Sequence, residues 1–229
     1  MKPLVECVPN FSEGRRPEVI EAIVAAMRAV PDVRVLDVES DGDHNRSVVT
    51  LVGPPPAVQE AAFKGIATAA SLIDLDQHKG AHPRLGATDV VPFVPVGGVT
   101  MEECIALAHG LGQRVAEELH IPVFFYESAA LRPERTNLED VRRGEYELLK
   151  KEIGTNPDRQ PDCGPAAVGK AGATIIGARP YLIAFNAYLN TTEVSIANKI
   201  AKAVRHSSGG YHFVKAMGLL VAGDRKSVV

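Results

Sequence analysis

The stretch QHKGAHPRLGATDVVPFVP, residues 77–95, joins a loop that carries a histidine to an apolar run typical of a buried strand. Gly80 gives the loop backbone freedom, and Pro83 disfavours a helical conformation at His82, so His82 is predicted to lie in a loop. Arg84 adds a permanent positive charge close by. A titratable base beside a cation is a candidate reaction centre, and the alternative interpretation is a structural histidine packed under a turn.

On both sides of this stretch, strand-like apolar runs alternate with helical patterns, as expected of an α/β or α+β protein. A helix is predicted from Pro17 with Ser12 as its cap, because Pro suits a first helical turn. Further helices are predicted at 57–73, 101–119 and 138–153. Strands are predicted at 4–8, 33–38, 47–52, 90–94 and 122–126, with 33–38 and 47–52 forming a hairpin.

The segment 154–172 is rich in Pro, Gly and Asp and is predicted to be a linker or a ligand-binding loop. A strand at 181–189, a helix capped by Thr192 and a strand at 211–221 are expected after it. A strand, helix and strand cannot cover both faces of a sheet, so this second part looks incomplete. We therefore expect a layered α+β chain whose second part is incomplete.

Composition narrows the classes of function. The 229 residues are 45% hydrophobic and 23% charged, as in a globular protein, and the formal net charge is −3 with no Trp. A negative chain without Trp is not expected to bind nucleic acid. No apolar run approaches a membrane span or a signal sequence, and the three cysteines lie far apart. These features predict a soluble cytoplasmic protein with reduced thiols and no membrane partner.

Three apparent motifs lack a required residue. GPAAVGKA, residues 164–171, has Ala171 where a phosphate loop needs a hydroxyl group. Asp41, Asp43 and Asn45 resemble the start of a calcium loop, but the glycine and glutamate positions of that loop are not kept. His78 and His82 have zinc-like spacing, yet the glycine and proline between and after them break the helix that would align them. No metal site is therefore expected.

Separated blocks of the chain resemble the glutamate formimidoyltransferase family, in the family's order and from Leu4 to about Met217. The blocks are VECVPNFSEG (5–14), LDVESDGDHNRSV (36–48), HKGAHPRLGATDVVPFVPV (78–96), PDCGP (161–165) and GARPYLIAFNAYLNTT (177–192). The resemblance implies a dimeric transferase of histidine catabolism, which moves the formimidoyl group from N-formimidoyl-L-glutamate to the co-substrate tetrahydrofolate.

The resemblance also implies an architecture. A formiminotransferase N-terminal subdomain at 1–178, an α/β sandwich with a mixed sheet and helices, would be followed by a ferredoxin-like C-terminal subdomain at 179–229, with folate bound between them. The ending GDRKSVV, residues 223–229, resembles nothing in the family, so the C-terminal subdomain is expected to be partial.

The roles of individual residues follow from the resemblance and the reaction. One histidine with an ordinary pKa near 6.5 can remove a proton and return it, and the family places this role on His82. Glu39 is expected to orient His82 or the formimidoyl group. Arg46, Lys79 and Arg84 are the candidate cations for substrate carboxylates, with Arg84 favoured over Arg46. The predicted folate-binding residues are Gly164, Pro165, Ala166, Ala167, Val168, Gly169, Lys170 and Gly172, in a loop where Cys163 replaces an aromatic residue.

Three hypotheses stay open at this point. The chain is either the transferase itself or a relative that binds folate or handles formyl-folates without formimidoyl transfer. A structural role beside a partner is the third hypothesis. Ligand-induced stabilisation by tetrahydrofolate separates the structural role from the other two, and a turnover assay separates the transferase from the folate binder.

Overall fold

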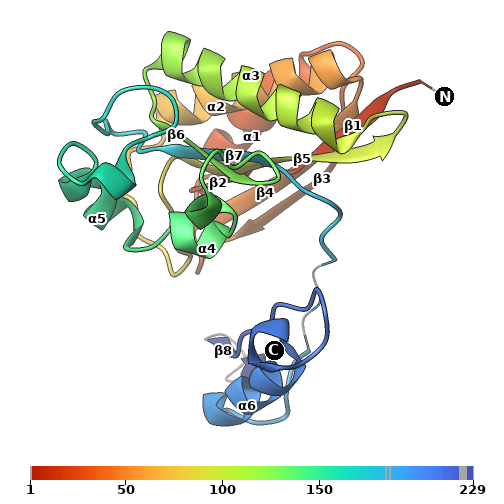
Figure 1. Ribbon diagram of the computed structural model, residues 1–229, viewed down its shortest axis with the longest axis vertical. Helices are drawn as coiled ribbons and strands as arrows, with labels where there is room; N and C mark the ends of the chain where they lie inside the picture. Colours follow the sequence, from red (N-terminus) through yellow and green to blue (C-terminus); the bar gives the residue numbers. More distant parts are fainter. Residues whose placement is uncertain (1, 184, 186, 222–225, 229) are drawn as a thin grey trace. The chain divides into compact units, whose positions relative to one another are not determined.

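The computed structural model describes residues 2–183, 185, 187–221 and 226–228. The chain divides into a larger unit that ends at Tyr181 and a smaller unit that begins at Leu182 (Figure 1). The predicted boundary between residues 178 and 179 refers to the family's subdomains and stays a prediction.

A mixed sheet forms the centre of the larger unit. Its strands are β1 (Leu4–Cys7), β2 (Asn10–Phe11), β3 (Arg34–Asp41), β4 (Arg46–Gly53), β5 (Thr88–Gly97), β6 (Val123–Glu127) and β7 (Thr174–Ala178). The short strands β1 and β2 both lie between β4 and β5 and run antiparallel to them, and β3 pairs with the outer side of β4. On the other side of β5, β7 and then β6 continue the sheet in parallel. The fold is thus α+β with a mixed sheet, as expected.

Helices α1 (Pro17–Arg28), α2 (Pro55–Leu72) and α3 (Met101–Leu119) cover one face of the sheet (Figure 1). Their buried residues, including Met27, Ile66 and Leu111, pack with Phe93 and Phe125 of the sheet in the main core. Helix α3 occupies the predicted range because Thr100 and Glu103 form a reciprocal capping box at its start. At α1 the prediction of Pro17 in the first turn is confirmed, whereas the cap position is Arg16 and not Ser12.

Two short helices, α4 (Leu138–Val141) and α5 (Glu145–Glu152), lie on the opposite face (Figure 1). The predicted single helix 138–153 is wrong. Gly144 has a φ of 78°, in the left-handed region that a continuous helix excludes. The break allows Val141 and Leu149 to pack with Val90 of the sheet in a second apolar cluster.

The sequence analysis missed β7 and β2. Strand β7 follows the segment 154–172 at once and lies between β5 and β6. This segment is therefore a loop within the larger unit and not a linker between domains. The hairpin 33–38 with 47–52 is confirmed as β3 and β4, and both strands are longer than predicted.

The smaller unit contains α6 (Val194–Val204) and an antiparallel pair, β8 (Leu219–Val221) with β9 (Lys226–Val228). Its helix is confirmed, but Glu193 and not Thr192 is the cap position. In the described part of 181–189 no strand forms, and only the end of the predicted strand 211–221 is extended as β8. A strand depends on a partner, and the apolar Ile183 and Phe185 are 91% and 82% exposed instead of packed. The ferredoxin-like topology stays a prediction.

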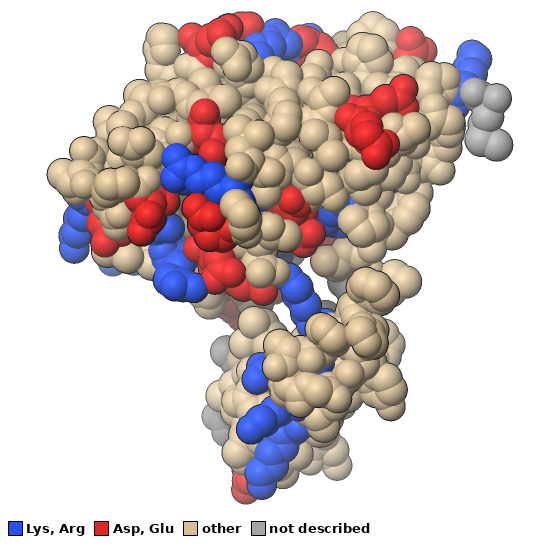
Figure 2. Space-filling view, viewed as in Figure 1, with Lys and Arg blue, Asp and Glu red and all other residues tan. Residues whose placement is uncertain are grey.

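The larger unit carries Lys and Arg side chains next to Asp and Glu side chains on the visible face (Figure 2). No helix in the described ranges is both long and apolar enough to cross a membrane. Cys7, Cys104 and Cys163 are free thiols.

Candidate functional site

The loop that carries His82 packs on the turn between β3 and β4. The amide of Ala81 donates to the carbonyl oxygen of Asp43 at 3.2 Å. A Cβ atom at Gly80 would clash with the carbonyl oxygen of His44, so only glycine allows this close approach. The turn and the loop together hold His82 half-buried at the end of the sheet.

Asn45 joins three segments at this end of the sheet. Its Oδ1 accepts a hydrogen bond from the amide of Gly14 at 2.9 Å, and its Nδ2 donates to the carbonyl oxygen of Lys79 at 3.0 Å. Its own carbonyl oxygen lies 3.0 Å from Nε2 of His78. Asn45 is 7% exposed and has a φ of 50°, a conformation that Asn tolerates. The sequence analysis treated Asn45 only as part of a failed calcium loop and missed this role.

His82 lies among positive charges. Its ring centre is 6.5 Å from that of His44. Burial, and then the charges of Arg46, Arg142 and His44, lower the pKa of His82 to about 3. The expectation of an ordinary pKa near 6.5 is therefore wrong for this structure, because burial and neighbouring cations both oppose the imidazolium. The ring is neutral at pH 7 and can act there as a base.

Arg46 begins β4 and points its guanidinium at β2. Its Nη2 donates to Oδ1 of Asn10, while its Nε is buried without a hydrogen-bond partner among the described residues. Burial, followed by the charge of Arg142, lowers the pKa of Arg46, and Asp89 and Glu39 act in the opposite direction. Glu39 is exposed on the neighbouring strand β3. The charge of Arg46 thus acts on His82 and the charge of Glu39 acts on Arg46, and we call these three residues the Arg46 neighbourhood.

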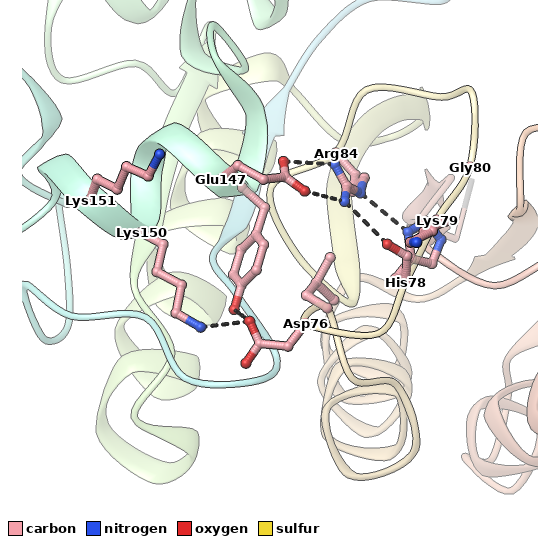
Figure 3. A pocket seen from close by; sticks show the side chains of 10 residues that line it. Asp76, His78, Lys79, Gly80, Arg84, Glu147, Lys150 and Lys151 are labelled. Atoms are coloured by element: carbon pink, nitrogen blue, oxygen red, sulfur yellow. Dashed lines mark hydrogen bonds and ion pairs between the residues drawn. The ribbon is translucent and has the colours of Figure 1, made fainter.

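Arg84 is in a different environment, because its guanidinium is already paired. Nη1 donates to Glu145 at 2.8 Å, and Nη2 donates to Glu147 at 2.7 Å (Figure 3). Both glutamates belong to α5. Nε donates to Nδ1 of His78 at 3.2 Å. The side chain of Arg84 is only 8% exposed. A substrate carboxylate would have to displace Glu147 to reach the same fork.

His78 connects Arg84 to the loop. Its Nδ1 accepts from Arg84 and its Nε2 faces the carbonyl oxygen of Asn45, so these partners assign a neutral ring with the proton on Nε2. Burial lowers the pKa of His78, and the backbone contact with Asn45 partly offsets this effect. His78 is therefore a structural link between α5 and the turn.

Lys79 projects into an open pocket of about 540 Å³ beside Arg84. Lys150 and Lys151 of α5 line the opposite side of this pocket (Figure 3). Lys150 is paired with Asp76 at 2.5 Å. His82 and Arg46 are not among the residues that line this pocket, although the backbone of Lys79 accepts from Asn45, the residue before Arg46.

The predicted folate loop has fixed ends and an exposed middle. The amide of Val123 donates to the carbonyl oxygen of Cys163 at 2.9 Å, and the amides of Leu75 and Ala87 donate to those of Lys170 and Ala171, each at 2.8 Å. Between these anchors the loop is mostly exposed, with Val168 half-buried and Gly172 buried.

Glycines allow the bends at the two ends of this loop. Gly164 and Gly172 have φ values of 90° and 69°, and Gly172 forms an isolated bridge with Gly86, just past Arg84. The Lys170 ammonium lies 3.3 Å from Asp74. Exposed glycine amides between rigid anchors suit a loop that contacts a ligand. In the described residues no group of three or more His, Cys, Asp or Glu side chains is placed to hold a metal ion.

Known proteins resemble this chain over most of its length. The profile of the formiminotransferase domain, N-terminal subdomain, matches residues 4–179. A protein named glutamate formimidoyltransferase from Thermoplasma acidophilum is 51% identical over 220 residues, which are 95% of this chain and 72% of that protein. One of the same name from Streptococcus pyogenes serotype M1 is 46% identical over 96% of this chain and 74% of its own length.

A longer relative matches the same part of the chain. The formimidoyltransferase-cyclodeaminase of Mus musculus is 48% identical over 92% of this chain, which covers 39% of the mouse protein. The profile match and these identities both extend across the strands and loops that surround His82. This chain therefore belongs to the formiminotransferase family.

Proposed function

We propose that the chain is a glutamate formimidoyltransferase that moves the formimidoyl group from N-formimidoyl-L-glutamate to tetrahydrofolate. The observation that supports the transferase class most directly is the 51% identity over 95% of this chain with a relative of that name. The observation that supports the site is His82, a neutral half-buried base at pH 7 surrounded by cations that attract the carboxylates of both substrates.

His82 is the proposed catalytic residue. When bound, the folate supplies the nucleophilic nitrogen, N5. His82 accepts the proton that this nitrogen loses as its bond to the formimidoyl carbon forms. His82 then returns the proton to the amine nitrogen of glutamate as the bond between that nitrogen and the carbon breaks, so one group serves as base and acid.

Substrate charge makes this proton cycle feasible. In the free protein Arg46 and its neighbours disfavour a positive charge on His82. A carboxylate bound between these cations and His82 would offset their repulsion and raise the pKa of the imidazole. His82 therefore becomes a stronger base only when substrate is in place.

The other proposed site residues lie either near Arg46 or near Arg84. Arg46 is the proposed carboxylate anchor, because its Nε is a buried donor without a partner among the described residues. Glu39, exposed beside it, is proposed to face the cationic formimidoyl group. Lys79 is proposed to attract anionic parts of the substrates from its pocket. Arg84 is proposed to support the loop, and its direct contact with a substrate carboxylate stays a prediction.

The folate is proposed to contact the loop from Gly164 to Gly172. Its exposed glycine amides and the fixed ends next to the His82 loop fit this role. A homodimer and a cytoplasmic location complete the proposal, and both rest on the family resemblance and on the sequence composition.

A turnover assay tests the proposal. The purified chain is incubated with N-formimidoyl-L-glutamate and tetrahydrofolate, and the release of glutamate and the formation of formimidoyl-folate are followed. Transfer above the rate without protein is expected. Stabilisation by tetrahydrofolate or folinate without any transfer would favour the folate-binding or formyl-folate-handling alternative instead.

A further inference from the structure

Arg142 is a cation that the sequence analysis did not consider. It follows α4 directly as the C-terminal cap position of that helix. Its Nη2 donates to Oδ2 of Asp89, at the start of β5, and the side chains of the pair are 14% and 3% exposed. Asp89 is fixed in turn, because its Oδ1 accepts from the amide of Leu85 at 2.8 Å.

Strands β2 and β5 bring Arg142 and Arg46 to the same place. Arg46 donates to Asn10 of β2, and Asn10 pairs with Val90 of β5, the residue after Asp89. The two guanidinium groups are thus attached to neighbouring positions on adjacent strands. The charges of both reach the imidazole of His82.

Buried donors without acceptors gather at this point. Six buried side-chain polar atoms of the described residues lack a hydrogen-bond partner, and they include Nε of Arg46 and Nε of Arg142. Buried polar groups are normally paired, so these two Nε atoms indicate a place where an acceptor from a ligand completes the hydrogen bonding.

We infer that Arg142 is a second carboxylate-binding residue, which holds a dicarboxylate substrate beside His82 together with Arg46. The inference rests on the proposed function for the identity of the substrate. Arginine suits the role because its planar fork can donate to Asp89 and to a ligand carboxylate at the same time. Asp89 keeps Arg142 in position. The site then holds two guanidinium groups and one internal carboxylate, so one positive charge remains for a carboxylate of the ligand.

The experiment measures binding of L-glutamate and of glutarate by calorimetry, with L-glutamine as the probe that lacks one carboxylate. Arg142→Gln should weaken binding of both dicarboxylates about 10-fold or more, the scale of a lost hydrogen bond to a charged group. The affinity of Arg142→Lys for the dicarboxylates should lie between those of Arg142→Gln and wild type. The matched control is Arg143→Gln, because the side chain of Arg143 is 76% exposed and pairs only locally with Asp140. This control should bind within about twofold of wild type.

A second variant tests the inference without leaving a buried charge unpaired. Arg142→Gln leaves Asp89 buried and unpaired, so the double variant Asp89→Asn with Arg142→Gln removes both charges together. A folded double variant that binds dicarboxylates as tightly as wild type would overturn the inference, and so would a wild-type protein that binds neither dicarboxylate.

Kinetics distinguish this inference from the proposed function. If formimidoyl transfer occurs, Arg142→Gln should raise the KM for N-formimidoyl-L-glutamate more than it lowers kcat. Active enzyme with an unchanged KM would end the inference and leave the proposed function intact. Binding of glutamate that depends on Arg142, without any formimidoyl transfer, would support the inference and contradict the proposed function.

Discussion

Arg46 and Arg84 are both close to His82, one through its charge and the other along the chain, and they have opposite surroundings. The Arg46 side combines the half-buried Arg46 and Arg142 with the neutral imidazole of His82, and the buried Nε atoms of both arginines have no hydrogen-bond partner among the described residues. The Arg84 side pairs one guanidinium with two glutamates and a histidine. Two arginines with the same chemistry therefore differ: Arg46 keeps a donor that our proposal assigns to a ligand carboxylate, and Arg84 links α5 to the loop.

The direction of the pKa changes expresses the same contrast. Arg84 has a raised pKa, because hydrogen bonds and charges from Glu147 and Glu145 outweigh its burial. Arg46 has a lowered pKa, because burial and Arg142 outweigh its carboxylate neighbours. A site that must attract anions needs cations like Arg46. The charge of Arg84 is already neutralised by internal carboxylates.

The largest expected effect separates the two histidines. His82→Ala should lower kcat about 100-fold or more with the fold intact, the usual scale for a general acid–base group. His78→Ala should act mainly on stability, because His78 links Arg84 to Asn45. Steady-state kinetics and thermal melting measure both. A His82→Ala protein within a few-fold of wild type would remove His82 from the mechanism.

The next largest effect is a difference in KM between variants of Arg46 and Arg84. Arg46→Gln should raise the KM for N-formimidoyl-L-glutamate about 10-fold or more, because it removes an unneutralised cation. Arg84→Gln should change this KM less and should lower Tm, because it leaves Glu145 and Glu147 without their partner. Steady-state kinetics and melting curves measure the KM and the Tm of both variants. The opposite ranking of the two KM values would restore the expectation that Arg84 binds the substrate carboxylate.

A third test concerns the contact between the loop and the turn. Gly80→Ala should destabilise the protein by about 1–3 kcal/mol, because the new methyl group would meet the His44 carbonyl oxygen. Gly169→Ala is the matched control, since no heavy atom lies within 4 Å of its added Cβ. Urea denaturation measures both free energies of unfolding. Equal stability of the two variants would show that the loop does not depend on this close approach.

The last test concerns a pH dependence of stability. The pKa of His82 is lowered to about 3, so as pH falls from about 6.5 to 3 the unfolded chain binds a proton that the folded protein does not. The free energy of unfolding should therefore become smaller as the pH falls through this window. His82→Gln should reduce the slope between pH 6.5 and 5, measured by urea denaturation. An unchanged slope in the variant would contradict the low pKa.

Local patterns predicted much of the larger unit. Helix α3 and the strands β4 and β5 have clear signals, because burial on one or both faces leaves a regular apolar pattern. Strand β7 was missed because two apolar runs follow one another, 174–178 and 181–189, and the second was taken as the strand. The structure selects the first run because it pairs with both β5 and β6.

The sequence alone determined the family, the α+β class and the loop that presents His82. These depend on short motifs and on local backbone preferences at residues such as Gly80 and Pro83. Only the tertiary structure decided which cation is available to a ligand. The partners of Arg84 lie 61 and 63 positions away along the chain, and Arg142 reaches Asp89 across 53 positions. Charge pairing over such separations depends on how α4 and α5 pack on the sheet, and no local pattern contains that information.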